Sequence, residues 1–223
     1  MQITITLSFV IITCLISITA FNRQNMIDDL IFYPPAISKR KQFYRFISHG
    51  FIHADVMHLA FNMIAFYSFG QGLEKVFNFS CVFGNYGKLF YLLLYFSALI
   101  VASLPDYIKY RDSYHFRSLG ASGAVSAVIF SMIIFFPQSP IGLIFLPLRI
   151  PGYIFAIIYL GITVYLDRRG GSRINHSAHF WGAAYGIVFT LVFCELFASN
   201  FDVYDNFMTQ LRSTSEDLVL ICN

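Results

Sequence analysis

Residues 118–136 read SLGASGAVSAVIFSMIIFF, an apolar run with no charged side chain. The uncharged stretch continues to Leu148, but three prolines interrupt its second half: Pro137, Pro140 and Pro147. Proline ends a helix rather than extending it, because it lacks an N–H and clashes with the preceding turn. We therefore expect one short helix over about residues 120–136, followed by a turn-rich loop that reaches Arg149.

The composition places this run in a membrane protein. Hydrophobic residues make up 57% of the chain and charged residues 12%, whereas charged residues make up roughly a quarter of a soluble domain. A helix that spans the hydrocarbon needs roughly 20 residues, with about 17 as the lower limit. Six uncharged stretches reach that length: residues 1–22, 56–73, 89–105, 118–148, 150–166 and 174–194. The sequence therefore predicts an all-α membrane protein, a bundle of six transmembrane helices.

We expect one transmembrane domain over residues 1–198 and a C-terminal tail over 199–223, because no loop is long enough for a second soluble domain. The tail mixes acids, amides and hydroxyls without clear periodicity, so it is expected to have little structure of its own. Residues 1–22 are expected to form the first span. A cleaved signal peptide is the alternative, although no basic residue precedes the apolar core.

The four cysteines are scattered through the chain without CxxC spacing: Cys14, Cys81, Cys194 and Cys222. Neither a disulfide framework nor a thiolate metal site is indicated by this pattern. We expect the cysteines to be inert.

Four polar residues of catalytic type converge on one depth in the membrane. The second, fourth and sixth spans begin at the same membrane face. At 1.5 Å per residue, His58 lies about 5 Å and Asn62 about 10 Å into the second span. His179 lies about 9 Å into the sixth span, and Ser122 about 9 Å below the face where the fourth begins. Such residues are costly inside lipid unless they are used, so the sequence indicates an enzyme that works within the membrane.

Ser122 lies between small residues in the segment GASG, residues 120–123, at the predicted N-terminus of a helix. Unpaired backbone N–H groups and the positive end of the helix dipole favour a developing oxyanion there. A serine that only caps a closely packed helix is the alternative interpretation of this motif alone.

His179 precedes Gly182 by three residues and Gly186 by seven, so the three share a helix face. Small residues at this spacing let another backbone approach closely. Alone, the GxxxG motif predicts only helix association. Next to an intramembrane histidine, it predicts that the approach brings the imidazole against the Ser122 hydroxyl, which needs a base within hydrogen-bond reach to become a nucleophile.

His58 and Asn62 are four residues apart and share a face of the second span, so both can donate toward one point. Donors aimed at the oxygen of a tetrahedral intermediate in a site poor in water contribute on the order of 3 kcal/mol each. For either residue alone, an interhelical hydrogen bond that holds the bundle together is the alternative.

Three segments carry a resemblance to a known family: residues 49–62 (HGFIHADVMHLAFN), 120–123 (GASG) and 178–186 (AHFWGAAYG). They look like the three signature segments of the rhomboid intramembrane serine proteases, in the same order and on the same spans. The resemblance covers about residues 45–186.

This resemblance implies a six-helix rhomboid-like bundle in which Ser122 is the nucleophile and His179 the general base and acid, with no third acidic residue. His58, Asn62 and the Ser122 backbone N–H would form the oxyanion hole. The partners would be the lipid bilayer and the transmembrane segments of other proteins, cut near a membrane face next to a small residue. No metal or cofactor is implied, and the location would be the inner cell membrane in a bacterium.

Weaker matches accompany these segments, and one position departs from the family pattern. The pair Tyr44–Arg45 resembles a Trp–Arg pair of the family's first loop, and Glu74 falls where the family often has an acidic residue. Many members have an aromatic residue four positions after the nucleophile, which stacks on the catalytic histidine, whereas this chain has Ser126. An aromatic from elsewhere, Trp181 or Tyr185, is expected to substitute.

The side of the membrane is left open by two opposing indications. The first, third and fifth loops hold eleven of the fifteen Lys and Arg residues, so the positive-inside rule places the active-site face in the cytoplasm. The resemblance to bacterial rhomboids implies the opposite orientation.

The net charge of +3 suits anionic lipid headgroups, and nothing indicates nucleic acid. The sequence gives no oligomeric state.

Two other functions compete with proteolysis. A metal-dependent membrane enzyme is suggested by the histidines at 49, 53, 58, 176 and 179, but the sequence has no HExxH motif and only Asp55 accompanies them. The other is a catalytically inactive rhomboid-like protein that binds membrane helices. Such proteins typically lack the serine or the histidine, and both are present here.

Overall fold

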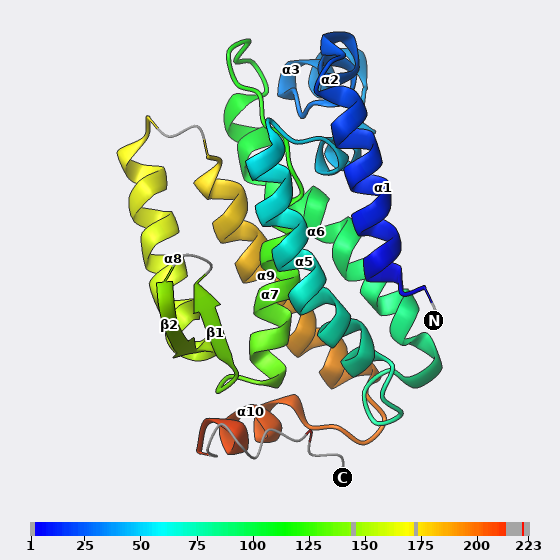
Figure 1. Ribbon diagram of the computed structural model, residues 1–223, viewed down its shortest axis with the longest axis vertical. Helices are drawn as coiled ribbons and strands as arrows, with labels where there is room; N and C mark the ends of the chain where they lie inside the picture. The colour runs from blue at the N-terminus through cyan, green and yellow to red at the C-terminus, as the bar shows by residue number, and fades with distance from the viewer. Residues whose placement is uncertain (1–2, 144–145, 172–173, 213–219, 221–223) are drawn as a thin grey trace.

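The computed structural model describes residues 3–143, 146–171, 174–212 and 220, and its described part is mostly helical, as predicted (Figure 1). The helices are α1 Ile5–Ala20, α2 Gln24–Leu30, α3 Pro34–Arg40, α4 Arg45–Ser48, α5 Val56–Phe77, α6 Gly87–Tyr110, α7 Ser122–Phe135, α8 Gly152–Arg169, α9 His176–Phe197 and α10 Val203–Arg212. Strands β1 Pro140–Leu143 and β2 Leu146–Pro151 precede α8, and short 3-10 turns cover His49–Phe51 and Gly84–Tyr86.

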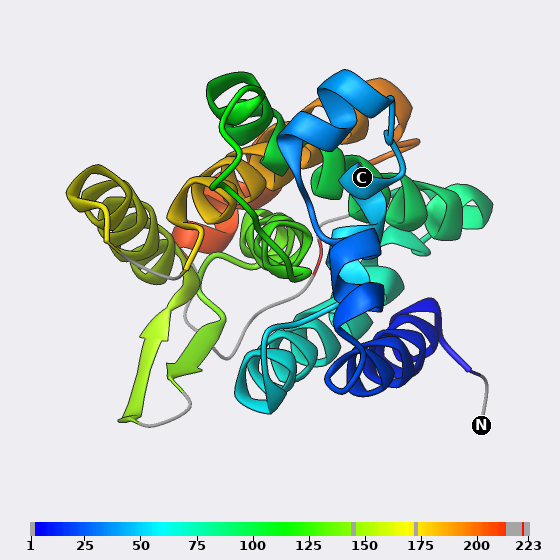
Figure 2. The ribbon, with the colours of Figure 1, turned by 90° about the horizontal axis from the view of Figure 1, so that it is seen from above.

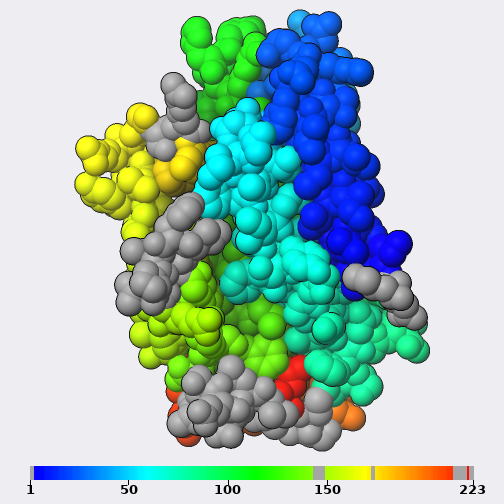
Figure 3. Space-filling model, in the orientation of Figure 1, coloured from blue at the N-terminus to red at the C-terminus, as the bar shows by residue number. Residues whose placement is uncertain are grey.

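Helix α7 lies at the centre of the bundle, in contact with α5, α6, α8, α9 and α10. Its residues are buried except Ser122, Ile129 and Met132. Helices α1 and α8 lie at separate edges (Figure 2), and on the face shown in Figure 3, α5 lies between them. A helix that is apolar on every side needs such a buried position, and the apolar run at 122–135 has it.

The predicted spans match the long helices approximately, with one clear difference. Two of the described helical segments, Gly84–Tyr110 and His176–Phe197, are long and apolar enough to cross a membrane by length and composition. Helix α6 continues through Pro105 to Tyr110, beyond the predicted end at residue 105. Asp106, the charged residue directly after Pro105, is tolerated inside the helix because it is buried and accepts a hydrogen bond of 2.6 Å from the Asn175 side chain.

The expected turn-rich loop after α7 contains a β-hairpin. Strands β1 and β2 pair antiparallel, with Ile141 opposite Ile150 and Gly142 opposite Arg149. Pro140 and Pro151 face each other at the open end of the hairpin. Proline is tolerated at such positions, because a two-stranded sheet has only edge strands and a strand end needs no ladder N–H.

The expectation of little structure after residue 198 is wrong for α10, which packs under α7 at the bottom of Figure 1. Asn206 on its buried face donates a hydrogen bond of 3.0 Å to the backbone oxygen of Phe135. Gln138 donates one of 2.9 Å to the backbone oxygen of Leu211. Helix α10 thus caps the C-terminal end of α7, where carbonyl groups lack intrahelical partners.

The cysteine spacing indicated no disulfide framework, but Cys81 is disulfide-bonded. Cys14 and Cys194 are free thiols. Cys222 lies outside the described residues.

A buried carboxylate joins α1 to α5 near their ends. The Glu74 side chain accepts hydrogen bonds from the backbone N–H groups of Ile5 and Thr6, each at 2.9 Å, and from the Thr6 hydroxyl at 2.8 Å. Because the Thr6 hydroxyl donates to Glu74, the Tyr91 hydroxyl 2.8 Å away donates to Thr6. The carboxylate therefore satisfies the first turn of α1 and complements its dipole.

Glu74→Ala is predicted to lower the thermal unfolding midpoint of the detergent-solubilised protein. The substitution leaves two backbone N–H groups and a hydroxyl without their acceptor, at a cost of about 1–3 kcal/mol. The matched control is Glu195→Ala, since Glu195 is exposed on α9. Equal midpoints for the two variants would show that the carboxylate does not hold α1 in place.

Candidate active site

A close backbone contact joins α7 to α9 at the predicted glycines. A Cβ atom built on Gly182 would lie 3.0 Å from the Gly123 Cα and in contact with the Gly123 carbonyl oxygen. One built on Gly186 would lie 2.7 Å from the Ala127 Cα. Side chains essentially never approach backbone this closely, so only glycine fits at either position. The predicted role of the GxxxG motif as a helix contact is confirmed.

This contact places His179 and Ser122 on facing turns. Ser122 directly precedes Gly123, and a Cβ on Gly123 would lie 3.4 Å from the carbonyl oxygen of Ala178, the neighbour of His179. Ser122 and His179 are both half-buried. Among the hydrogen bonds of the described residues, none joins the two side chains. Nucleophile and base are often further apart in a free enzyme than in its substrate complex, so the arrangement suits a dyad.

Ser122 begins α7 after a sharply turned segment. Gly120 has a φ of +114°, which L side chains rarely adopt. Its N–H donates to the backbone oxygen of His49 at 2.9 Å, and Ser118 exchanges two backbone hydrogen bonds with Phe32. The segment before Ser122 is therefore fixed to the first loop, and the N–H groups of the first turn of α7 have no intrahelical acceptor.

His53 fixes the same segment from another direction. The Ser17 hydroxyl donates to the Phe51 carbonyl at 2.9 Å, so it accepts from His53 Nδ1 at 3.0 Å. His53 Nε2 is then free of a proton and accepts from the backbone N–H of Ala121 at 3.4 Å. Burial lowers the pKa of His53 to about 3, so the ring is neutral in this role. The sequence singled out His53 only among the histidines of the metal-enzyme alternative, so this role was not predicted.

Asn175 holds the N-terminus of the helix that carries His179. Its side-chain oxygen accepts from the Ala178 N–H at 3.0 Å, the N-cap arrangement. Its amide nitrogen donates to Asp106 on α6 at 2.6 Å and to the Ser118 hydroxyl at 3.1 Å. Asn175 was not among the predicted site residues, although an asparagine before an apolar run is an N-cap signal.

His58 lies against the turn that precedes Ser122. A Cβ on Gly120 would lie 2.8 Å from the His58 Cε1 and 3.0 Å from its Nε2. The Asp55 carboxylate caps α5 by accepting from the His58 N–H at 2.8 Å. The structure therefore brings His58 beside the GASG segment, as an oxyanion donor requires.

Asn62 is buried one turn further along α5. Its side-chain nitrogen donates to the backbone oxygen of His58 at 2.9 Å. One of its two amide protons is engaged within the helix, which leaves one for a ligand. Asn62 therefore shares the helix face of His58, as predicted, but makes no described contact with Ser122.

The aromatic ring that lies on His179 comes from α8. Neither predicted substitute contacts His179 among the described ring contacts, because Trp181 lies against Phe180 and the Tyr185 hydroxyl donates to Ser97 at 2.7 Å. Instead the Tyr159 ring is nearly parallel to the imidazole, with centroids 6.3 Å apart and an angle of 18°. The expectation of Trp181 or Tyr185 is wrong.

The remaining histidines form no metal-binding group in the described part of the chain. No cluster there contains three or more His, Cys, Asp or Glu side chains placed to hold an ion. His49 is buried beside Phe32, and burial lowers its pKa to about 4. His176 contacts the His179 ring edge-on at 6.1 Å.

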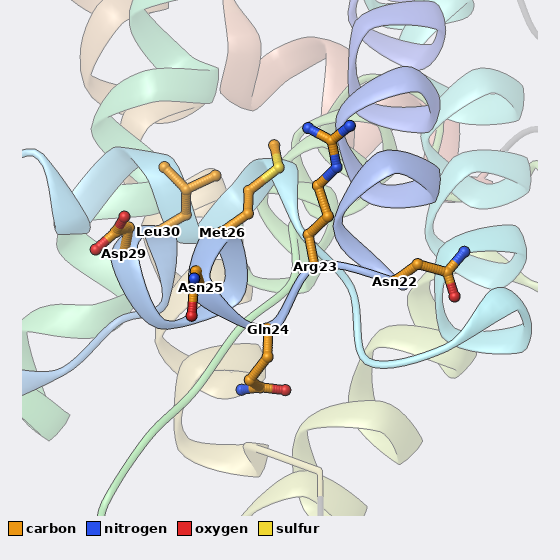
Figure 4. Close-up of a pocket in the computed structure, with 7 residues that line it drawn as sticks. All are labelled: Asn22, Arg23, Gln24, Asn25, Met26, Asp29 and Leu30. Atoms are coloured by element: carbon orange, nitrogen blue, oxygen red, sulfur yellow. The ribbon is translucent and has the colours of Figure 1, made fainter.

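The described surface has two hollows, and one of them borders Ser122. A small cavity borders Ser122, Gly123 and Asn175, and His49 and Ser103 also line it. Figure 4 shows a wider surface depression around the turn between α1 and α2, from Asn22 to Leu30. None of the predicted site residues lines the depression, so the candidate site is the region between α5, α7 and α9.

Comparison with known proteins identifies the family of this chain. A family model described as the rhomboid domain matches residues 40–196, more than half of the chain. The mitochondrial RHOMBOID-like protein 12 of Arabidopsis thaliana is 28% identical over 179 residues, covering 74% of this chain and 50% of that protein. The mitochondrial presenilin-associated rhomboid-like protein of Homo sapiens is 27% identical over 154 residues, covering 67% of this chain and 38% of that protein. The chain thus spans at most half the length of these two relatives. It belongs to the rhomboid family.

Proposed function

We propose that this protein is an intramembrane serine endopeptidase that cleaves the transmembrane segments of other membrane proteins with Ser122 and His179. The observation that carries the proposal is the contact of Gly182 with Gly123, which sets the turn of His179 against the turn of Ser122. Family membership supports it, since rhomboids are typically serine proteases.

The proposed topology has six spans, formed by α1, α5, α6, α7, α8 and α9. As a rhomboid, the chain is a membrane protein with a helical bundle. Large apolar side chains are exposed on its outer helices, including Ile157 on α8 and Leu196 on α9. Helix α7 has 14 residues, so it is about 21 Å long against a hydrocarbon core of about 30 Å. That shortness supports a position of Ser122 below the membrane face.

In the proposed reaction, His179 takes the proton of the Ser122 hydroxyl as the oxygen attacks the substrate carbonyl. The tetrahedral intermediate collapses when the C–N bond breaks and His179 gives the proton to the leaving amine. Water, with His179 again as base, then hydrolyses the acyl-enzyme and regenerates Ser122.

The proposed oxyanion hole consists of the Ser122 N–H at the start of α7, the His58 ring and the remaining amide proton of Asn62. His58 lies beside Gly120, and Asn62 follows on the same helix face. Fixed donors in a site poor in water stabilise the charge of the intermediate without reorganisation. A non-catalytic protein that binds membrane helices would need no such donors.

Ser122→Ala and His179→Ala are each predicted to abolish cleavage of a generic fluorescent transmembrane substrate by the purified protein. Neither substitution removes a hydrogen bond of the described structure, so both variants are expected to fold. His115→Ala is the control, because His115 is exposed in the loop between α6 and α7. Wild-type activity in the Ser122 variant, or loss of wild-type activity with a chelator, would overturn the serine mechanism.

His58→Ala and Asn62→Ala are predicted to lower kcat by about 10- to 1,000-fold, the cost of a missing oxyanion donor. The change in KM is expected to be small, because these donors act on charge that develops after substrate binds. Steady-state kinetics with the same substrate measure both constants. Unchanged kcat in both variants would remove them from the oxyanion hole.

A further inference from the structure

Tyr159 lies beside the His179 imidazole and belongs to α8, a helix at the edge of the bundle (Figure 2). Its ring and the His179 ring are 6.3 Å apart at an angle of 18°. Aromatic pairs with centroids about 4.5–7 Å apart attract each other in this offset-stacked arrangement. Two phenylalanine rings also pack against Tyr159. The ring centroid of Phe130 on α7 is 5.4 Å from that of Tyr159, and the centroid of Phe155 on α8 is 5.5 Å from it.

A hydrogen bond from the serine helix fixes the far end of this ring. The Ser126 and Tyr159 hydroxyl oxygens are 2.7 Å apart. Ser126 is buried on α7 and follows Ser122 by four residues, so both lie on one face of that helix. Helix α7 therefore supplies the candidate nucleophile and also the group that anchors the ring lying on the candidate base.

The orientation of the imidazole depends on such ring contacts. Among the described residues, no group hydrogen-bonds to the His179 side chain and no acidic residue forms an ion pair with it. Two ring contacts of the imidazole are described: Tyr159 is nearly parallel to it, and His176 is edge-on with ring centroids 6.1 Å apart. Tyr159 is tied to the helix of Ser122 through the Ser126 hydroxyl.

We propose that Tyr159, held by Ser126, is a positioning residue that orients the His179 imidazole toward Ser122. This inference rests on the proposed protease function and adds to it a residue of α8 that touches neither the substrate nor the nucleophile. The small Ser126 side chain leaves room for the Tyr159 hydroxyl, so the serine at this position and the tyrosine of α8 form one functional unit.

The test is the rate at which a fluorophosphonate probe labels Ser122, measured together with kcat and KM for a transmembrane substrate. The probe is small, so its labelling rate measures the nucleophilic reactivity of Ser122 and does not depend on the docking of a substrate helix. Tyr159→Leu is expected to lower the labelling rate and kcat about tenfold with KM unchanged, because the imidazole loses its stacking partner.

Two milder substitutions test the hydrogen bond separately. Tyr159→Phe keeps the ring and Ser126→Ala removes its anchor, so each is expected to lower the labelling rate by about two- to fivefold. The double variant is expected to be no slower than either single one, because all three lack the same hydrogen bond. These variants decide the question even if Tyr159→Leu does not fold.

The control is Tyr165→Leu, which makes the same substitution at an exposed position of α8 and is expected to label at the wild-type rate. Labelling of Tyr159→Leu at the wild-type rate would overturn the inference and leave the protease function standing. An equal loss in Tyr165→Leu would also overturn it, because the loss of any tyrosine ring from α8 would then be sufficient. A wild-type protein that neither labels nor cleaves would overturn the proposed function, and the role of Tyr159 with it.

Discussion

The backbone contact between α7 and α9 is the constraint on which the candidate site depends. Gly182 and Gly186 present no side chain, so α9 lies directly on Gly123 and Ala127 of α7. Lipid tails supply no hydrophobic force between helices, so close packing of this kind is what holds membrane helices together. The same contact sets the helical turn of His179 against that of Ser122. The interface that stabilises the helix pair is therefore also the one that brings the two candidate catalytic residues together.

Polar groups around this contact fix its details. Asn175 joins the start of α9 to α6 and to the segment before α7, while His53 holds the backbone immediately before Ser122. Each is buried or half-buried and has partners, as buried polar groups must. Tyr159 adds a third helix, α8, to the surroundings of His179. The position of the imidazole thus depends on the packing of several helices and not on a single partner.

The sequence predicted much of this arrangement, because composition and periodicity determine spans and because the glycine spacing predicts a close helix contact. It did not predict the hairpin at 140–151 or α10, whose stability comes from pairing and from contacts with α7. It also missed Tyr159, since Ser126 and Tyr159 are 33 residues apart in sequence and only the fold brings their hydroxyls together. Local patterns carry no information about such distant pairs.

The most direct measurement of the central claim is fluorophosphonate labelling of Ser122 in Gly182→Val beside Gly161→Val. A Cβ at 182 would meet the backbone of Gly123, whereas nothing lies within 4 Å of one at 161 on α8. Both substitutions place the same side chain in a helix, so they share any intrinsic helix penalty. The account predicts wild-type labelling for Gly161→Val and no labelling for Gly182→Val. Equal labelling of the two variants would contradict it, because Ser122 would then be active without the close approach of α9.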